Sequence, residues 1–433
     1  MKEKEEFLGE LADMIIVVLS MLLIHLVLSA FTGKWPWSGN PYNSYTLQAC
    51  AWLEGRLDLG MNYEYLELAI LGEKYFVSFP PFPSYLLLPF AALTGVNTPD
   101  GWIALFSILV GSIYAVKLFW LKKETRKHAV FWTLFLFLGT NVVLVTMDGW
   151  VWFIAQNLCL TLSLMAIYYA VKGKGGWSLF FWGCSVGCRP LQVLYFPILV
   201  YLLYRNLKEQ EPEQNFWYFL KKKFYWAIPV GIIALSYMIL NYARFGSITE
   251  FGHNYLPEHT RDGKGQFGIE FFAENLKNCL RLPVFTKEGK VQFYMFDGNA
   301  FWLVSPLFVS YGIYWIRGIM KKRKGNPILY FGIPLCIIVH MAALMLHRTM
   351  GGSHFGNRYL NDILPYIFLG IWLLIYEGDK KKEDVPEKEA ESIEQMEKGG
   401  VIDDFIIKLQ YPIALFGMAL NVVGTLLYYN GWA

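Results

Sequence analysis

The chain has 433 residues, of which 55% are hydrophobic and 18% aromatic. That composition is too apolar for a soluble domain of this length, and runs of about 20 apolar residues, the length of a membrane-spanning helix, recur along the whole chain. The formal net charge of +3 lies in short loops, so it indicates membrane topology and gives no argument for nucleic-acid binding.

In chain order, the first apolar run is 14–31, which we interpret as a retained span rather than a cleaved signal peptide. The long segment 32–99 follows as the first outer loop. Within it, 44–53 has an apolar face typical of an amphipathic helix on the membrane surface. Segment 84–94 is apolar but too short to cross, which predicts an interfacial or re-entrant helix.

Basic clusters occupy every second gap between the apolar runs. The clusters are Lys122/Lys123/Arg126/Lys127, Lys172/Lys174, Lys221/Lys222/Lys223, Lys321/Lys322/Arg323/Lys324 and Lys380/Lys381/Lys382. Short basic loops stay on the cytoplasmic side of a membrane. We therefore expect the N-terminus inside, the C-terminus outside, and any site for an outer polar substrate in the gaps that lack these clusters.

The same alternation predicts an all-α polytopic membrane protein of about eleven transmembrane helices. The expected spans after the first are 101–121, 129–147, 150–171, 176–188, 190–204, 225–243, 300–318, 327–346, 360–376 and 411–430. Between them, 244–299 is expected to be a long outer loop. Segment 378–404 is rich in Lys and Glu, which predicts a solvated cytoplasmic loop. No repeat is visible, so 1–433 is taken as one transmembrane domain.

The pair 176–188 and 190–204 is predicted to be a short hairpin with Arg189-Pro190 at its tip. A dozen helical residues rise only about 18–20 Å, less than the hydrocarbon thickness. Arg189 would then lie within the outer half of the membrane, where an arginine is costly. It should face a cavity or an anionic partner.

Carboxylates and cations gather in the outer gaps, which suits a reaction on an anionic, lipid-borne substrate. Arg358 lies four residues after His354 in a glycine-rich stretch that permits close backbone approach, so we expect a phosphate or sugar site there. Lys74, six residues before Pro80, is a further candidate ligand contact. The six cysteines are scattered and are interpreted as small apolar residues. No metal, nucleotide or dinucleotide motif appears, so the sequence supports no cofactor, and a divalent metal is left open without any signature for it.

These motifs, in this order, resemble the GT-C superfamily of integral-membrane glycosyltransferases, in particular its bacterial protein-mannosyltransferase-like branch. The segments that carry the resemblance are 51–59 (AWLEGRLDL), 72–83 (GEKYFVSFPPFP), Arg189-Pro190, 241–247 (NYARFGS), 251–253 (FGH), 355–359 (FGNRY) and 362–365 (DILP). The resemblance implies a GT-C fold with a long first outer loop that carries interfacial helices. It also implies inverting transfer of a monosaccharide from a polyprenyl-phosphate donor to an acceptor hydroxyl of an envelope glycan, lipid or protein, on the outer face of a bacterial cytoplasmic membrane.

The resemblance also implies site residues. The general base of this fold is usually an acid early in the first outer loop, but this chain has Asn40 and other amides there. The acids placed most similarly are Glu67 first and Asp148 second. By the same likeness, the expected substrate contacts are Asn40, Lys74, Arg189, Arg244, His253, His354, Arg358 and Asp362.

Two rival functions remain open on the sequence. A transporter or flippase of a lipid-linked sugar would have charges within spans and broken helices in related positions. A protein that binds such a lipid without catalysis is suggested by the amide at Asn40.

Overall fold

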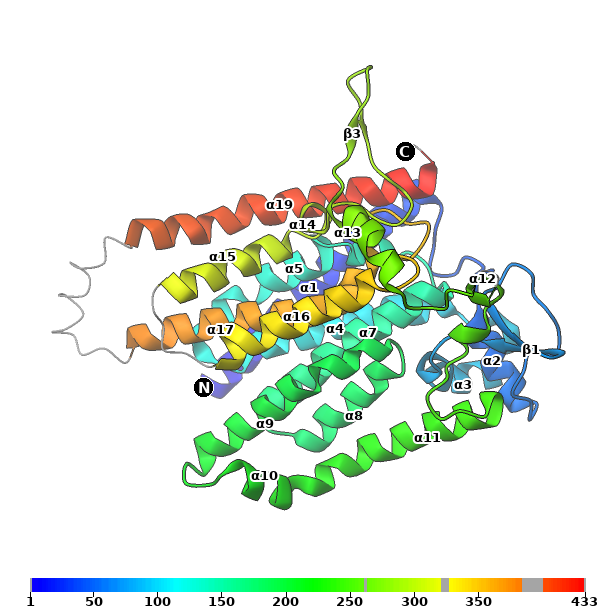
Figure 1. Ribbon diagram of the computed structural model, residues 1–433. Coiled ribbons are helices and arrows are strands. Elements are labelled where there is room, and N and C mark those ends of the chain that lie inside the picture. Colours follow the sequence, from blue (N-terminus) through cyan, green and yellow to red (C-terminus); the bar gives the residue numbers. More distant parts are fainter. Residues whose placement is uncertain (1, 261–262, 321–326, 384–399, 432–433) are drawn as a thin grey trace.

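The computed structural model describes residues 2–260, 263–320, 327–383 and 400–431. Most of the chain is helical, and its helices run side by side, alternating between two ends of one bundle (Figure 1). The longer helices are α1 (Lys2–Thr32), α4 (Asp100–Trp120), α7 (Val151–Val171), α11 (Ala227–Phe245), α16 (Ile333–Met345), α17 (Leu364–Glu383) and α19 (Gly400–Asn430). The expected all-α architecture is therefore found, with two short β-hairpins added to it.

Seven helical segments of the described chain are long and apolar enough to cross a membrane, so the prediction of eleven spans is wrong. The seven segments are Glu3–Thr32, Asp100–Trp120, Val151–Val171, Phe216–Phe245, Ile328–Met345, Arg358–Gly378 and Asp404–Asn430. This number fits a multi-pass membrane protein.

The four remaining predicted spans are helical but short or interrupted. They correspond to α5 (Ala129–Leu138) with α6 (Val142–Val145), α8 (Gly175–Val186), the 3-10 helix η3 (Pro190–Tyr195) with α9 (Phe196–Gln210), and α14 (Phe301–Val304) with α15 (Leu307–Met320). The first is broken after Gly139, and the last at Ser305-Pro306, where proline cannot continue a helix. Apolar composition alone cannot reveal these breaks, because the residues on both sides remain apolar.

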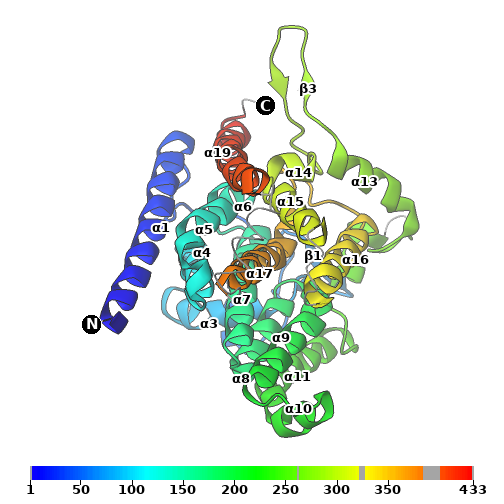
Figure 2. The ribbon, with the colours of Figure 1, turned by 90° about the vertical axis from the view of Figure 1, so that its left-hand side faces the viewer.

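The helices α7 and α17 form the centre of the bundle. In their most apolar stretches, 89% and 94% of the residues are buried, against 11% for Phe216–Phe245. Figure 2 shows α17 in the middle of the bundle and α1 at its edge. Gly111 of α4 lets that helix approach α7 closely, since a Cβ atom there would lie 2.6 Å from Thr161 Oγ1. The outer helices of the bundle expose their apolar side chains and so present a lipid-facing surface.

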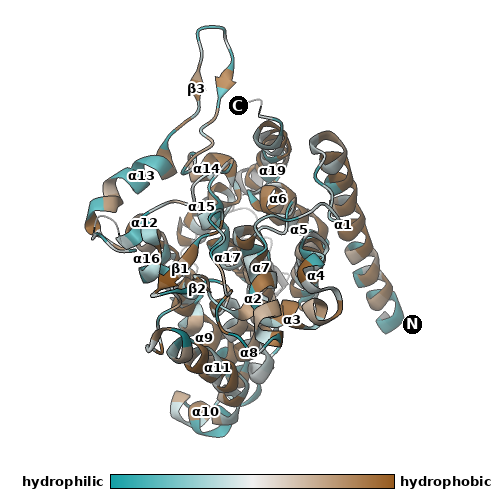
Figure 3. Ribbon diagram, turned by 90° about the vertical axis from the view of Figure 1, so that its right-hand side faces the viewer, coloured by the Kyte–Doolittle hydropathy of each residue, from teal (hydrophilic) through white to brown (hydrophobic). Residues whose placement is uncertain are grey.

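One end of the bundle carries the polar loops and is named here the loop end; it contains 32–99 and most of 246–300 (Figure 3). The predicted surface helix is present with the expected bounds as α2 (Ser44–Leu53), and six of its residues are buried. It packs on α3 (Phe82–Thr94), the short apolar segment that was predicted not to cross.

Two hairpins interrupt the helical pattern. Strands β1 (Leu68–Leu71) and β2 (Lys74–Val77) pair antiparallel around Gly72, whose φ of +61° suits glycine. The second hairpin, β3 (Val284–Phe285) with β4 (Val291–Gln292), projects from the bundle (Figures 1 and 2).

Short helices complete both ends. They are α10 (Phe216–Lys223), α12 (Pro257–Thr260), α13 (Phe272–Leu280) and the 3-10 helices η1 (Gly95–Asn97), η2 (Lys123–His128), η4 (Phe224–Trp226), η5 (His253–Tyr255), η6 (Ile269–Phe271) and η8 (Arg358–Ile363), with the π-helix η7 (Ile328–Gly332) leading into α16. The predicted cytoplasmic loop 378–404 lies mainly outside the described residues; its two ends extend α17 to Glu383 and start α19 at Gly400.

Candidate functional site

Glu67 lies in the loop end directly before β1, where its carboxylate meets the start of α7. Trp152 Nε1 donates a hydrogen bond of 3.0 Å to Glu67 Oε2. Burial raises the pKa of Glu67 above its usual 4.5, while the Trp152 hydrogen bond and the positive charge of Arg358 act in the opposite direction. The result is a carboxylate that is more basic than an exposed one and that has an arginine nearby.

Arg358 begins η8 and is buried, with 4% of its surface exposed. Its Nε and Nη2 atoms both donate to the Gly351 carbonyl oxygen, at 3.1 and 2.5 Å. Gly351 has φ +108°, and a Cβ atom there would lie 2.9 Å from Arg358 Nε, so glycine is needed. The third nitrogen, Nη1, is buried without a hydrogen-bond partner among the described residues. Two of the three guanidinium nitrogens are thus held by the Gly351 carbonyl oxygen, and Nη1 has hydrogen-bonding capacity that the described residues do not use.

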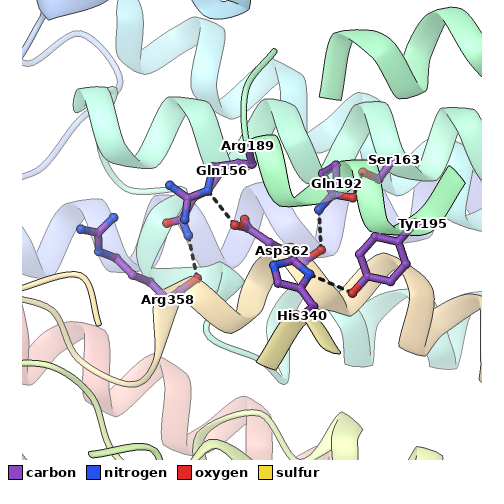
Figure 4. A network of polar contacts seen from close by, with 8 residues as sticks. All are labelled: Gln156, Ser163, Arg189, Gln192, Tyr195, His340, Arg358 and Asp362. Atoms are coloured by element: carbon purple, nitrogen blue, oxygen red, sulfur yellow. Dashed lines mark hydrogen bonds and ion pairs between the residues drawn. The ribbon is translucent and has the colours of Figure 1, made fainter. Parts of the chain in front are cut away.

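Arg189 is at the tip of the α8–α9 hairpin, as predicted, and its anionic partner is Asp362. Arg189 Nε and Asp362 Oδ2 are 2.6 Å apart (Figure 4). The Arg189 guanidinium also lies 4.8 Å from the centre of the Tyr359 ring. Gln192 Nε2 also donates to the Asp362 carbonyl oxygen at 2.7 Å. The charge of Arg189 is therefore balanced within the chain.

A polar network continues from this ion pair into the bundle (Figure 4). Ser163 Oγ lies 3.3 Å from Gln192 Oε1, and Tyr195 Oη lies 2.9 Å from His340 Nδ1. His340 in the middle of α16 is thus a buried histidine with a hydrogen-bond partner. Figure 4 also shows the Arg358 guanidinium pointing away from this network.

Asp148, between α6 and α7, forms a second acidic position beside Lys34. Burial raises its pKa, and the charge of Lys34 opposes that shift. The ammonium group of Lys34 lies 5.6 Å from the Trp150 ring centre. Tyr42 contacts both Trp150 and Trp152, at ring distances of 5.3 and 5.1 Å. The two acids, Asp148 and Glu67, therefore flank one aromatic cluster.

Asn40 is already engaged by protein groups. Its Nδ2 atom donates to Asp100 Oδ2 at 2.9 Å and to the Gly149 carbonyl oxygen at 2.7 Å. Thr46 Oγ1 donates to the other Asp100 oxygen at 2.6 Å. The sequence analysis did not single out Asp100, although its carboxylate is hydrogen-bonded to the amide of Asn40. Asp100 ties the long loop 32–99 to the start of α4.

The other predicted contacts are distributed around this cluster. Arg244 donates from Nη1 to the Val77 carbonyl oxygen at 3.1 Å and from Nη2 to Asn241 Oδ1 at 2.9 Å, so it anchors β2 to α11. Burial lowers the pKa of His253 and of His354 to about 3, so both are neutral at pH 7 and offer a ligand no positive charge. Lys74 is exposed at the turn of the β1–β2 hairpin.

The fold brings together residues that sequence reasoning missed. Trp152 is one, and its signal was the Trp150-x-Trp152 pair that follows Asp148-Gly149. His347 is another: its ring lies 5.7 Å from that of Tyr359, which in turn contacts Arg189. Within the described ranges, His, Cys, Asp and Glu form no group of three or more that could hold a metal ion.

Neither a protein-family model nor a curated protein matches this chain. The resemblance to GT-C glycosyltransferases therefore rests on the sequence motifs alone, and the helical architecture identifies no family.

Proposed function

We propose that this protein is an inverting glycosyltransferase of the GT-C type, which moves a monosaccharide from a polyprenyl-phosphate donor to an acceptor hydroxyl. The observation that carries the proposal is the pairing of a basic carboxylate, Glu67, with a buried arginine, Arg358, whose Nη1 atom has no hydrogen-bond partner among the described residues. An inverting transfer needs both: a base for the acceptor and a cation for the leaving phosphate.

In this proposal, the acceptor O–H gives its proton to Glu67 Oε1, the oxygen that Trp152 does not bind. The acceptor oxygen attacks the anomeric carbon, and the carbon–oxygen bond to the phosphate breaks with its electron pair on the phosphate. Arg358 Nη1 stabilises the charge that develops there, and the transition state has oxocarbenium character. No general acid is needed, because the leaving group is already an anion.

The lipid carrier of the donor fits the surroundings of these residues. Seven apolar helices give a membrane environment, and the loop end places polar residues above them. Three basic clusters of the described chain, in 122–127, 172–174 and 221–223, lie at the opposite end and favour a cytoplasmic location for that end. The proposed active site would then face outward, on the outer leaflet of a bacterial cytoplasmic membrane, where envelope acceptors are available.

Asp148 is the second candidate base. It flanks the same aromatic cluster as Glu67, but Lys34 and Tyr429 lie beside it. Aromatic rings pack well against the faces of sugar rings. The cluster of Tyr42, Trp150 and Trp152 is therefore the proposed sugar-binding surface between Glu67 and Asp148.

A transporter or flippase of the same lipid is the second candidate function. The polar network of Arg189, Asp362 and His340 within the bundle, and the interrupted helices α5–α6 and α14–α15, favour it. It predicts movement of the intact donor across a bilayer, independent of the Glu67 carboxylate. A binder without catalysis predicts neither movement nor transfer.

The test is sugar release from radiolabelled polyprenyl-phosphate monosaccharides by protein in lipid nanodiscs. Glu67→Gln should reduce release about 10²-fold or more and leave donor binding intact. Glu64→Gln, which removes an exposed carboxylate from the same loop, is the matched control and should retain activity. Release by the wild type that Glu67→Gln does not change would refute Glu67 as base and direct the test to Asp148→Asn. Saturable binding without any release would refute the transferase.

A further inference from the structure

A large open groove lies at the end of the bundle opposite to the candidate site, the basic end, where α8, α10 and α11 meet (Figures 1 and 2). Its volume is about 730 Å³, within the range of roughly 300–1,000 Å³ that is usual for small-molecule sites. Its lining residues are Lys174, Gly175, Gly176, Trp177, Phe180, Lys223, Tyr225, Trp226 and Pro229, together with Gly173.

The lining divides into a charged mouth and an aromatic wall. Lys174 directly precedes α8 and Lys223 ends α10; they supply two positive charges, and no carboxylate is among the lining residues. The ammonium group of Lys223 lies 4.9 Å from the Trp226 ring centre. Trp177 and Tyr225 are 57% and 49% exposed, as residues at a membrane interface commonly are.

Glycines create the space. A Cβ atom on Gly175 would lie 1.9 Å from the Trp226 ring, so only glycine lets the indole approach the start of α8 this closely. A Cβ atom on Gly176 would have only Trp226 Cδ1 within 4 Å, at 3.9 Å, so this glycine borders open space. A larger residue at this position would enter the groove without disturbing the helix.

An apolar track continues from the groove along α11. Ile228, Ile232 and Leu235 are 56%, 67% and 55% exposed on that helix, and α11 is apolar along most of its length in Figure 3. A ligand with a charged head at the lysines and a hydrocarbon tail along these side chains matches both parts of the surface.

We propose that this groove binds an anionic phospholipid, with its headgroup phosphate between Lys174 and Lys223 and an acyl chain along α11. Charge complementarity selects the anionic headgroup, because the mouth has two cations and no anion. Basic pockets between membrane helices are suited to such headgroups. The site is separate from the Glu67–Arg358 cluster and does not depend on the proposed transfer.

The experiment is native mass spectrometry of the purified full-length protein in detergent, with palmitoyl-oleoyl phosphatidylglycerol and the matching phosphatidylcholine as probes. The wild type should bind one phosphatidylglycerol in preference to phosphatidylcholine. Each lysine near a phosphate contributes roughly fivefold in affinity, so Lys174→Gln with Lys223→Gln should weaken phosphatidylglycerol binding by about 25-fold. Lys123→Gln with Lys221→Gln removes the same charge from exposed positions outside the groove and should change binding less than about twofold.

Gly176→Leu provides a second, uncharged test, because it should block the groove while both lysines remain. Loss of the bound phosphatidylglycerol in this variant supports the site. Equal affinity for the two lipids in the wild type would overturn the proposal. So would equal losses in the two double-lysine variants, because general surface charge would then explain the binding. If the Lys174/Lys223 variant does not remain monodisperse, retention of the lipid by Gly176→Leu overturns the proposal by itself.

Discussion

The ion pair between Arg189 and Asp362 provides the sharpest test of how the candidate site is built. Asp362→Asn removes the charge that balances Arg189 while preserving the shape of the side chain. Asp362 is almost completely buried, with 3% of its side chain exposed, and Arg189 is 20% exposed. Removing one partner of a buried pair costs about 3–5 kcal/mol, because the other charge is left uncompensated. The partial exposure of Arg189 and its contact with Tyr359 place the expected loss near the lower limit, about 3 kcal/mol.

The assay is equilibrium unfolding in mixed detergent–SDS micelles, followed by circular dichroism. The double variant Arg189→Met/Asp362→Asn should recover most of the loss, since removal of both charges is often close to neutral. Glu211→Gln is the control: it breaks the exposed ion pair with Lys222 and should destabilise the protein far less than Asp362→Asn, because solvent screens an exposed pair. The reasoning is refuted if Asp362→Asn behaves like Glu211→Gln, or if the double variant is as unstable as the sum of its single changes.

This prediction has a functional consequence. If Asp362 balances Arg189, we expect the phosphate of the donor to rely on Arg358, whose Nη1 atom has no hydrogen-bond partner among the described residues. Arg358→Gln should then lower donor affinity far more than the Arg189→Met/Asp362→Asn double variant does, measured as binding of the radiolabelled donor to nanodiscs. The opposite ranking would assign the phosphate to Arg189.

Three further predictions follow from single contacts. Transfer activity should fall as the pH decreases through the pKa of Glu67, which lies above 4.5. In Trp152→Phe, loss of the hydrogen bond that lowers this pKa should move the acidic limb of the pH–rate profile to higher pH. An unmoved limb would exclude Glu67 as the titrating base. Gly111→Ala should destabilise the protein by about 1–3 kcal/mol in the same unfolding assay, because the added methyl group disturbs the α4–α7 contact. Gly231→Ala should be tolerated, because a Cβ atom there meets nothing within 4 Å. Equal effects of the two substitutions would contradict the packing argument. In a variant without other cysteines, a cysteine replacing Lys74 should react with a membrane-impermeant maleimide in intact cells. A cysteine placed in α10 of the same variant should react only after the cells are permeabilised. The reverse pattern would invert the proposed orientation.

The amino-acid sequence by itself determined the local architecture of this protein. The apolar runs predicted the order of the helices along the chain, and the apolar face of 44–53 predicted the bounds of α2. The short hairpin with Arg189 at its tip followed from charge alternation and helix length. These features are local, so periodicity and charge rules are sufficient to find them.

Only the tertiary structure decided which of the helices are long enough to cross a membrane and which side chains meet. Breaks at Gly139 and at Ser305-Pro306 shorten segments whose apolar composition is unbroken. The partner of Arg189 is 173 residues away in the chain, and Trp152 is 85 residues from Glu67. Such pairings depend on how the helices pack around α7 and α17, and no pattern within a single segment records that packing.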